Sequence, residues 1–165
     1  MENEFNDTPE QSDFDIESDF NLKEEFKPTP LCQPGTYKGA ITEVRLDYAS
    51  QSIGWTVTLD GNEMFASDGV TPVDGMTFRH TSYLPKLADK GILTKGGKQT
   101  KYQAKINILA NFQEAMEIEF NTKQQIMDGI AGGTWIGLPV KVIISLQSWE
   151  GRVFNRTDRM MKDTD

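Results

Sequence analysis

Along much of the chain, apolar side chains occupy every second position, which is the spacing of a strand with one buried face. Residues 52–60 show this pattern most clearly, since Ile53, Trp55, Val57 and Leu59 alternate with glycine and threonine. We therefore predict a strand here, with Trp55 in the core and not on a binding surface.

Residues 36–48 predict a longer strand with one irregularity. Tyr37 and Ile41 share one phase of the alternation, whereas Val44 and Leu46 share the other. A phase change of this kind is produced by a β-bulge, and bulges let a strand bend around a barrel. We therefore predict a bulge between Ile41 and Val44.

The remaining pattern predicts more strands and two helices. The elements are a short strand over 63–66, a strand over 76–84, a helix over 104–119 with Ile108, Phe112, Ala115 and Met116 as its apolar stripe, a helix from Thr122 to Ile130, and a strand pair over 139–147 and 152–161. This order predicts a mainly β domain, a five-stranded OB-type barrel with a helical insertion between strands 3 and 4. A small β-sandwich with a helix fits the same pattern.

The N-terminal residues differ from the rest in charge and apolar content. Residues 1–30 contain ten acidic residues and two lysines, so they carry the whole net charge of −8 of the 165-residue chain. Such a segment buries too little apolar surface to offset its ordering entropy. We predict a disordered acidic tail and linker over 1–30 and one domain over 31–165, with its first strand starting near Gly35.

The sequence does not point to catalysis or to a bound cofactor. The only histidine, His80, falls on the apolar face of its predicted strand, and no Walker loop, nucleophile elbow or HExxH motif is present. Cys32 is the only cysteine, which excludes an intramolecular disulfide and a cysteine-rich zinc site. We expect a protein without enzymatic activity, cofactor or metal.

No part of the sequence predicts insertion into a membrane. No apolar run approaches the ~20 residues that a membrane helix needs, and residues 1–7 are polar and acidic, unlike a signal peptide. We therefore expect a cytoplasmic protein.

Two stretches combine positive charge with aromatic rings, the mixture that holds single-stranded nucleic acid through phosphate contacts and base stacking. Residues 79–105 hold seven basic residues and one acidic residue, and the last strand places Arg152, Phe154 and Arg156 on one face. The alternatives are a solvated lysine loop and an edge strand whose charges block aggregation. The predicted binding residues are Arg79, Tyr83, Lys86, Lys95, Lys98, Lys101, Tyr102, Trp149, Arg152, Phe154, Arg156 and Arg159.

The acidic tail suggests a role of its own. A tethered polyanion with spaced aromatic rings resembles nucleic acid electrostatically, so it could occupy a basic groove until a true polyanion displaces it. The tail could instead anchor a partner protein, or only confer solubility. The predicted partner-binding or autoregulatory residues are Phe14, Asp15, Asp19, Phe20, Glu24, Glu25 and Phe26.

The stretch 34–41, Pro-Gly-Thr-Tyr-Lys-Gly-Ala-Ile, is similar to the opening strand of bacteriophage single-stranded DNA-binding proteins. The resemblance continues through 55–61 and 137–142 to the Asn155-Arg156 pair, over roughly residues 30–160. It implies an OB fold, binding of single-stranded DNA with little sequence preference, and a role in phage replication or recombination in the host cytoplasm. Replication or recombination proteins would be its protein partners. Family members commonly carry the acidic tail at the C-terminus, whereas the acidic segment here is N-terminal.

Two functions of other classes also fit the sequence. One is a structural or adaptor protein, such as a virion or assembly component, that docks a protein partner through its tail. The other is an inhibitor of a host protein whose acidic tail mimics DNA.

Overall fold

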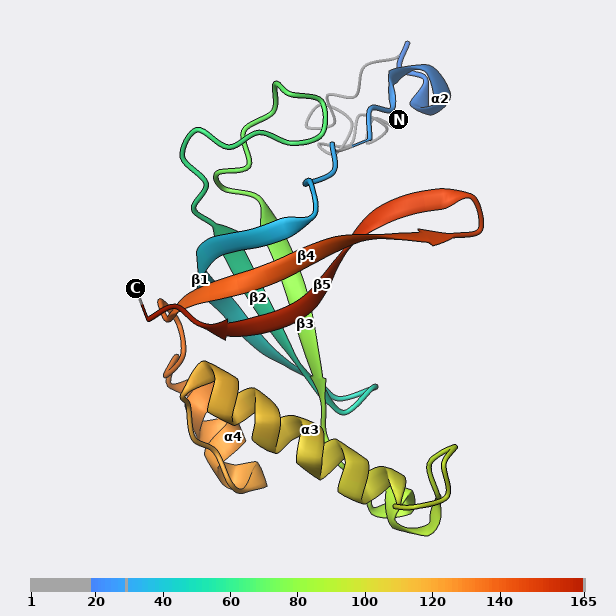
Figure 1. Cartoon of the computed structure of the whole chain (residues 1–165), viewed down its shortest axis with the longest axis vertical. Coiled ribbons are helices and arrows are strands. Elements are labelled where there is room, and N and C mark those ends of the chain that lie inside the picture. The colour runs from blue at the N-terminus through green and yellow to red at the C-terminus, as the bar shows by residue number, and fades with distance from the viewer. Residues whose placement is uncertain (1–18, 29, 165) are drawn as a thin grey trace, which may run out of the picture.

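All five strands of the domain belong to one antiparallel sheet. The computed structural model describes residues 19–28 and 30–164, and its strand order is β3-β2-β1-β4-β5. The elements are α2 (Leu22–Glu25), β1 (Gly35–Asp47), β2 (Ser52–Leu59), β3 (Thr77–Tyr83), the 3-10 helix η2 (Leu87–Gly91), α3 (Lys101–Met116), α4 (Lys123–Ala131), β4 (Pro139–Trp149) and β5 (Arg152–Lys162) (Figure 1). The predicted mainly β domain, with helices between its third and fourth strands, is therefore confirmed.

The sheet curls but does not close. The β1–β2 register shifts between Ile41 and Glu43, which confirms the predicted bulge, and a second shift lies between Ile143 and Ile144 in the β4–β5 ladder. Both shifts bend the sheet, so its two edge strands, β3 and β5, approach within 8 Å in places. Within residues 30–164 no hydrogen-bonded ladder joins these edges, so the closure of the predicted barrel is not observed. Because of the second bulge, Asp158 has no partner in the β4–β5 ladder, and it lies where β5 faces β3.

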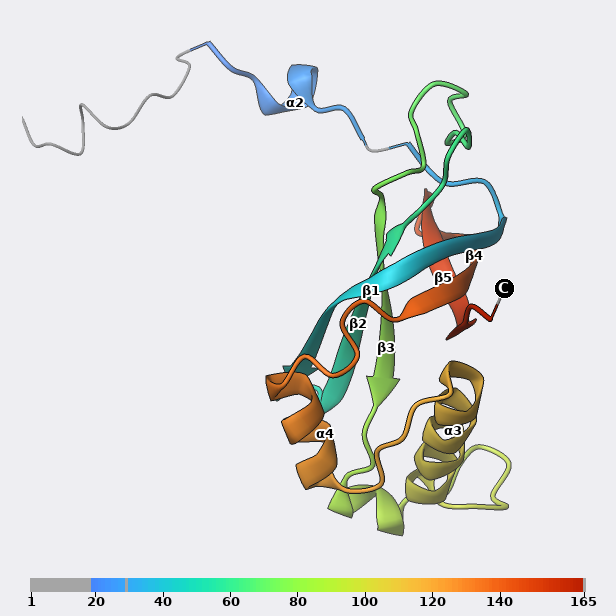
Figure 2. The same ribbon diagram turned by 90° about the vertical axis from the view of Figure 1, so that its left-hand side faces the viewer.

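The core lies between the concave face of the sheet and the two longer helices. Trp55 is fully buried at its centre, with its ring 5.1 Å from Phe112 and 5.4 Å from Trp135. Its indole N–H donates a hydrogen bond of 3.1 Å to the Ser82 hydroxyl. Trp55 is therefore a core residue, as predicted. Figures 1 and 2 show α3 and α4 together at one end of the strands.

Helix α3 differs from its prediction in its start and in its buried face. It begins at Lys101, because the Thr100 side chain accepts a hydrogen bond from the Gln103 N–H and caps the first turn. Its buried residues are Leu109, Phe112 and Met116, whereas Ile108 is 64% exposed. The predicted stripe was therefore wrong at Ile108. Ile108 and Leu109 are neighbouring apolar positions, and helical periodicity alone does not decide which of them faces the sheet.

Two further segments test the predicted elements. Helix α4 is capped by the Thr122 side chain and ends at Gly132, as predicted. The predicted strand over 63–66 was wrong, because only an isolated bridge joins Phe65 to Pro72 there. Glu63 has a positive φ of 61°, a turn conformation that interrupts an extended strand.

The described part of the tail contains one helical turn, α2, which the sequence analysis did not predict. The Asn21 side chain accepts hydrogen bonds from the N–H groups of Lys23 and Glu24 and so caps the turn. Glu25 accepts a hydrogen bond from the Asn21 N–H in return. This reciprocal capping, a local signal, explains the turn. Phe14 and Asp15 lie outside the described residues.

His80 is a packing residue whose ring stacks on Phe112, with centroids 5.1 Å apart and planes within 3°. Burial lowers the pKa of this imidazole below its ordinary 6.5. As the pH falls through 6.5, His80 is protonated in the unfolded chain before it is protonated in the folded chain. The folded state therefore loses, at low pH, part of the stability that it has at high pH. We expect the free energy of unfolding to fall more between about pH 7 and about pH 5.5 in the native chain than in a His80→Phe variant. Urea titrations at both pH values measure this difference, and equal losses in the two proteins would contradict it.

Candidate nucleic-acid interface

A groove of about 430 Å³ separates the edge strands β3 and β5. Arg79 and Thr81 line it from β3, and Phe154, Arg156 and Asp158 line it from β5. The fold thus brings Arg79 together with the terminal hairpin, although these residues lie far apart in the sequence.

The hairpin formed by β4 and β5 extends beyond the rest of the sheet (Figure 1). Trp149 pairs with Arg152, and the alternation along β5 places Phe154 and Arg156 on the same face as Arg152. Trp149 is 64% exposed and Phe154 is 40% exposed. The hairpin therefore presents Phe154 between two arginines, with Trp149 opposite Arg152 at its tip, as the sequence pattern predicted.

The outward face of β3 continues this surface toward the helices. Arg79 and Tyr83 lie on one face, opposite to the face that packs His80 against the core, and Tyr83 is exposed. Arg45, which is not among the predicted binding residues, pairs with Gly54 on the same outward face. Arg45 follows the bulge and lies between Val44 and Leu46, which both pack against the core. Counting alternate positions after the bulge would therefore have placed Arg45 on the outward face.

Gly54 provides the space in which the Arg79 side chain lies. A Cβ added to Gly54 would overlap the Arg79 guanidinium group. The sheet therefore holds this cation across β2, where the backbone of a glycine leaves room for it.

A Gly54→Ala variant is expected to displace the Arg79 guanidinium. If this surface binds single-stranded DNA, as the sequence predicts, the variant should bind it about threefold to tenfold more weakly, the loss of roughly one phosphate contact. Its folding should change little, since the far end of a flexible side chain can move. Binding titrations with oligo-dT at low salt, together with urea unfolding, measure both effects. Unchanged DNA affinity in a fully folded variant would show that the position of the Arg79 side chain does not contribute to DNA binding.

The arginines of β5 remain accessible to an anion. Arg156 forms a 3.3 Å ion pair with Asp158, and both side chains are partly exposed to solvent. Exposed pairs of this kind contribute ~0–1 kcal/mol, so a phosphate can displace the carboxylate. Arg159, on the far side of the bulge, is exposed opposite Ile143.

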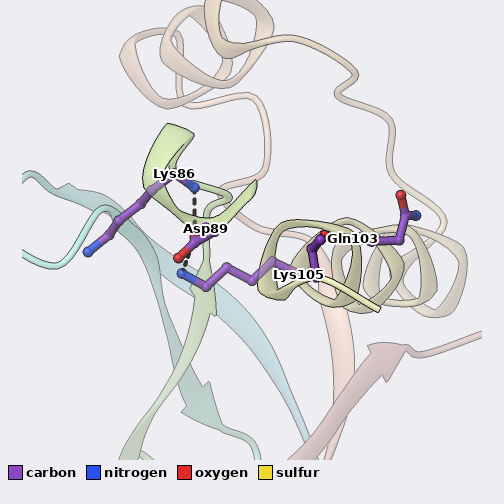
Figure 3. A network of polar contacts seen from close by, with 5 residues as sticks. Lys86, Asp89, Gln103 and Lys105 are labelled. Atoms are coloured by element: carbon purple, nitrogen blue, oxygen red, sulfur yellow. Dashed lines mark hydrogen bonds and ion pairs between the residues drawn. The ribbon is translucent and has the colours of Figure 1, made fainter. Parts of the chain in front are cut away.

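The predicted lysine loop lies apart from the groove, at the helical end. A buried carboxylate organises this loop: Asp89 accepts a 2.9 Å hydrogen bond from the Lys86 N–H and pairs with the Lys105 ammonium group at 2.8 Å (Figure 3). The side-chain bond from Lys105 is the main cause that lowers the Asp89 pKa. This network ties η2 to α3, while the side chains of Lys95, Lys98 and Lys101 are exposed.

Tyr102 differs from the other predicted stacking residues. The Lys90 ammonium group lies 4.9 Å from the centre of its ring, so one face is already covered. Its side chain also lines a second cavity beside α4 and not the groove. The predicted binding residues thus form two sets, one along the groove and hairpin and one at the helical end.

Asn155 joins the N-terminal linker to the groove. Its side-chain amide accepts a 2.8 Å hydrogen bond from the Cys32 N–H and donates one of 2.9 Å to the Cys32 carbonyl. Asn155 lies between Phe154 and Arg156, so the acidic segment leaves the domain next to the candidate interface. Asn155 is not among the predicted binding residues and enters the sequence prediction only through the resemblance. A polar residue on the inward phase of β5 was the available signal.

Comparisons with known proteins assign no family. No protein-family model matches the chain, and a search of curated proteins finds no match. No helix in the described part of the chain combines the length and apolarity needed to cross a membrane. Among residues 19–28 and 30–164, no group of three or more potential metal ligands is assembled.

Proposed function

We propose that this protein is a non-enzymatic single-stranded DNA-binding protein that acts with little sequence preference in phage replication or recombination, in the host cytoplasm. The observation that carries the proposal is the groove between β3 and β5, which is lined by Arg79 from one strand and by Phe154 and Arg156 from the other. Cations that contact phosphates and rings that stack on bases are the two elements that a single strand requires.

The strand arrangement supports the proposal. The edges of the sheet are β3 and β5, these edges face one another, and helices fill the connection between β3 and β4. This is the arrangement expected of an OB-type barrel, a fold that binds oligonucleotides on the face of strands 2 and 3 and at its loops. The strand arrangement therefore supports an OB-type domain, which is also the fold that the resemblance to phage proteins implies.

The proposed path of the DNA runs from the hairpin across the groove to the end of β3. Trp149, Phe154 and Tyr83 would stack on bases, each stack contributing ~1–3 kcal/mol. Four arginines, Arg79, Arg152, Arg156 and Arg159, would contact phosphates. Four such contacts on a single strand correspond to a slope of about −3 in log affinity against log salt.

Tryptophan fluorescence can test this path. Trp149 is exposed whereas Trp55 and Trp135 are buried, so quenching by oligo-dT should report mainly on Trp149. We expect salt-dependent quenching by single-stranded DNA, weaker quenching by duplex DNA, and loss of the signal in a Trp149→Phe variant. Absence of binding at low ionic strength, measured by quenching and by gel shift, would reject the proposal.

One observation favours a second function, that of an adaptor whose tail docks a protein partner. Phe20, Leu22 and Phe26 are all exposed around α2, next to Glu24 and Glu25. Amphipathic helical segments of this kind bind grooves in partner proteins. If the adaptor function is correct, the full chain does not bind DNA but retains a protein partner in a pull-down experiment. Deleting residues 1–28 then abolishes the retention of that partner. If the tail instead regulates DNA access, the same deletion raises DNA affinity.

A further inference from the structure

A second cavity, of about 620 Å³, lies at the helical end of the molecule, away from the groove. It is enclosed by α3, α4 and the β1–β2 turn, and most of its lining is apolar. The apolar lining includes Leu46, Tyr102, Ile106, Leu109, Phe120 and Ile126. A cavity of this size and composition can hold aromatic side chains.

One lysine lines this cavity, and two others are next to lining residues in the sequence or in space. Lys123 is part of its lining, Lys86 follows Pro85 of the lining, and Lys90 covers Tyr102. The carboxylate in the lining, Asp47, already accepts hydrogen bonds from the N–H groups of Ala49 and Ser50. The cavity is therefore suited to an aromatic ring carried by an acidic segment.

The N-terminal tail of this chain has that chemistry. Phe20 and Phe26 are 52% and 72% exposed, and the helical turn between them carries Glu24 and Glu25. Residues 1–30, to which this segment belongs, hold ten acidic residues and two lysines. Charge and apolar character thus match between the tail and the helical end.

We propose that the segment 20–26 of one copy docks into the helical-end cavity of a second copy. The phenyl rings enter the apolar cavity, and the glutamates pair with Lys123 of its lining and with the neighbouring lysines. The inference is independent of the proposed DNA binding, because the cavity and the groove are separate sites.

The anchor of the tail explains why the occupant comes from a second copy. Cys32 is held by Asn155 and lies 3.5 Å from the sulfur of Met76, just before β3. The cavity begins at Leu84, beyond the far end of that strand, roughly 26 Å away at the rise of a β-strand. Phe26 lies six residues before Cys32, a span of at most ~20 Å. Phe26 therefore does not reach the cavity of its own copy, whereas Phe20, twelve residues before Cys32, has a span of up to ~40 Å. Docking of both rings together requires a second copy, and Figure 2 shows α2 far from α3 and α4.

Sedimentation velocity of the full chain without nucleic acid tests this inference. We expect association that rises with concentration in the native protein. The double variant Phe20→Ser/Phe26→Ser and the cavity variant Ala110→Glu should each raise the dissociation constant by about tenfold or more. Ala110 is exposed on α3 and lines the cavity, and glutamate is a good helix former, so folding should be retained. Lys123→Glu provides a second cavity variant.

Matched controls separate docking from general effects of charge or apolar loss. Ile108→Glu adds the same charge to an exposed position of the same helix outside the cavity, and Phe65→Ser removes an exposed phenylalanine elsewhere. Both controls should associate as the native chain does. The inference is overturned if the native chain stays monomeric at all concentrations, or if association survives in both the tail variant and the cavity variants.

Mixing the two defective proteins distinguishes exchange between copies from docking within one copy. The Ala110→Glu protein keeps an intact tail, and the Phe20→Ser/Phe26→Ser protein keeps an intact cavity. Each should be monomeric alone, and the mixture should form a heterodimer. A mixture that remains monomeric would show that the tail does not dock on a second copy.

Discussion

Replacing Phe154 and Arg156 together by alanine is expected to weaken the binding of oligo-dT by about 100-fold, the equivalent of ~2.7 kcal/mol. The change removes one stacking platform and one phosphate contact from the same side of the groove. The domain should remain folded, because both side chains are exposed. Fluorescence anisotropy of labelled oligo-dT across a salt series measures the affinity, and the salt slope should fall by about 0.7 with the loss of one phosphate contact.

A paired variant of residues outside the groove lining serves as the control for this experiment. Val153→Ala removes an exposed apolar side chain from the other face of the hairpin, and Lys38→Ala removes an exposed cation from β1. The two changes together should leave affinity within about twofold of the native value. Equal affinities of the native chain and the Phe154/Arg156 variant would show that the hairpin is not part of the DNA-binding interface.

Replacing Trp55 by alanine is expected to lower the free energy of unfolding by ~3–5 kcal/mol. The indole is fully buried between Phe112 and Trp135, and its removal also takes away the hydrogen bond to Ser82. Since a domain of this kind has a total stability of about 5–15 kcal/mol, much of the variant could be unfolded at 37 °C. Urea unfolding followed by circular dichroism measures the loss.

Trp149→Ala is the matched control for the stability prediction, because it removes the same side chain from an exposed position. Its effect on the free energy of unfolding should stay within about 0.5 kcal/mol. A similar cost for both tryptophans would contradict the assignment of Trp55 to the centre of the core.

The elements whose signals are local could be predicted from the sequence. The strand with Trp55 follows from strict alternation, the bulge after Ile41 from a change of phase, and the start of α4 from a capping threonine. Each of these depends on residues within a few positions of one another. The α2 turn was missed although its Asn21 cap is local too, because the surrounding acidic composition indicated disorder.

The candidate site was predictable only in parts. The shared face of Arg152, Phe154 and Arg156 follows from the period of two along one strand. The separation of the lysine loop from the groove could not be predicted. The number of charges in residues 79–105 does not show that the lysines lie at the helical end of the sheet and Arg79 at the groove. In the sequence, Asp89 only reduces the net positive charge of the loop. In the structure, its ion pair with Lys105 connects that loop to α3.

The sequence by itself determined the alternation of β2, the phase change in β1, the Thr122 cap and the concentration of negative charge in residues 1–30, since short-range periodicity and composition govern these features. Only the tertiary structure decided that β3 and β5 face one another, that Arg79 lies across Gly54, and that Asn155 holds Cys32 beside the groove. These contacts join residues far apart in the chain. They depend on how far the two bulges curl the sheet, a long-range property that no local pattern encodes.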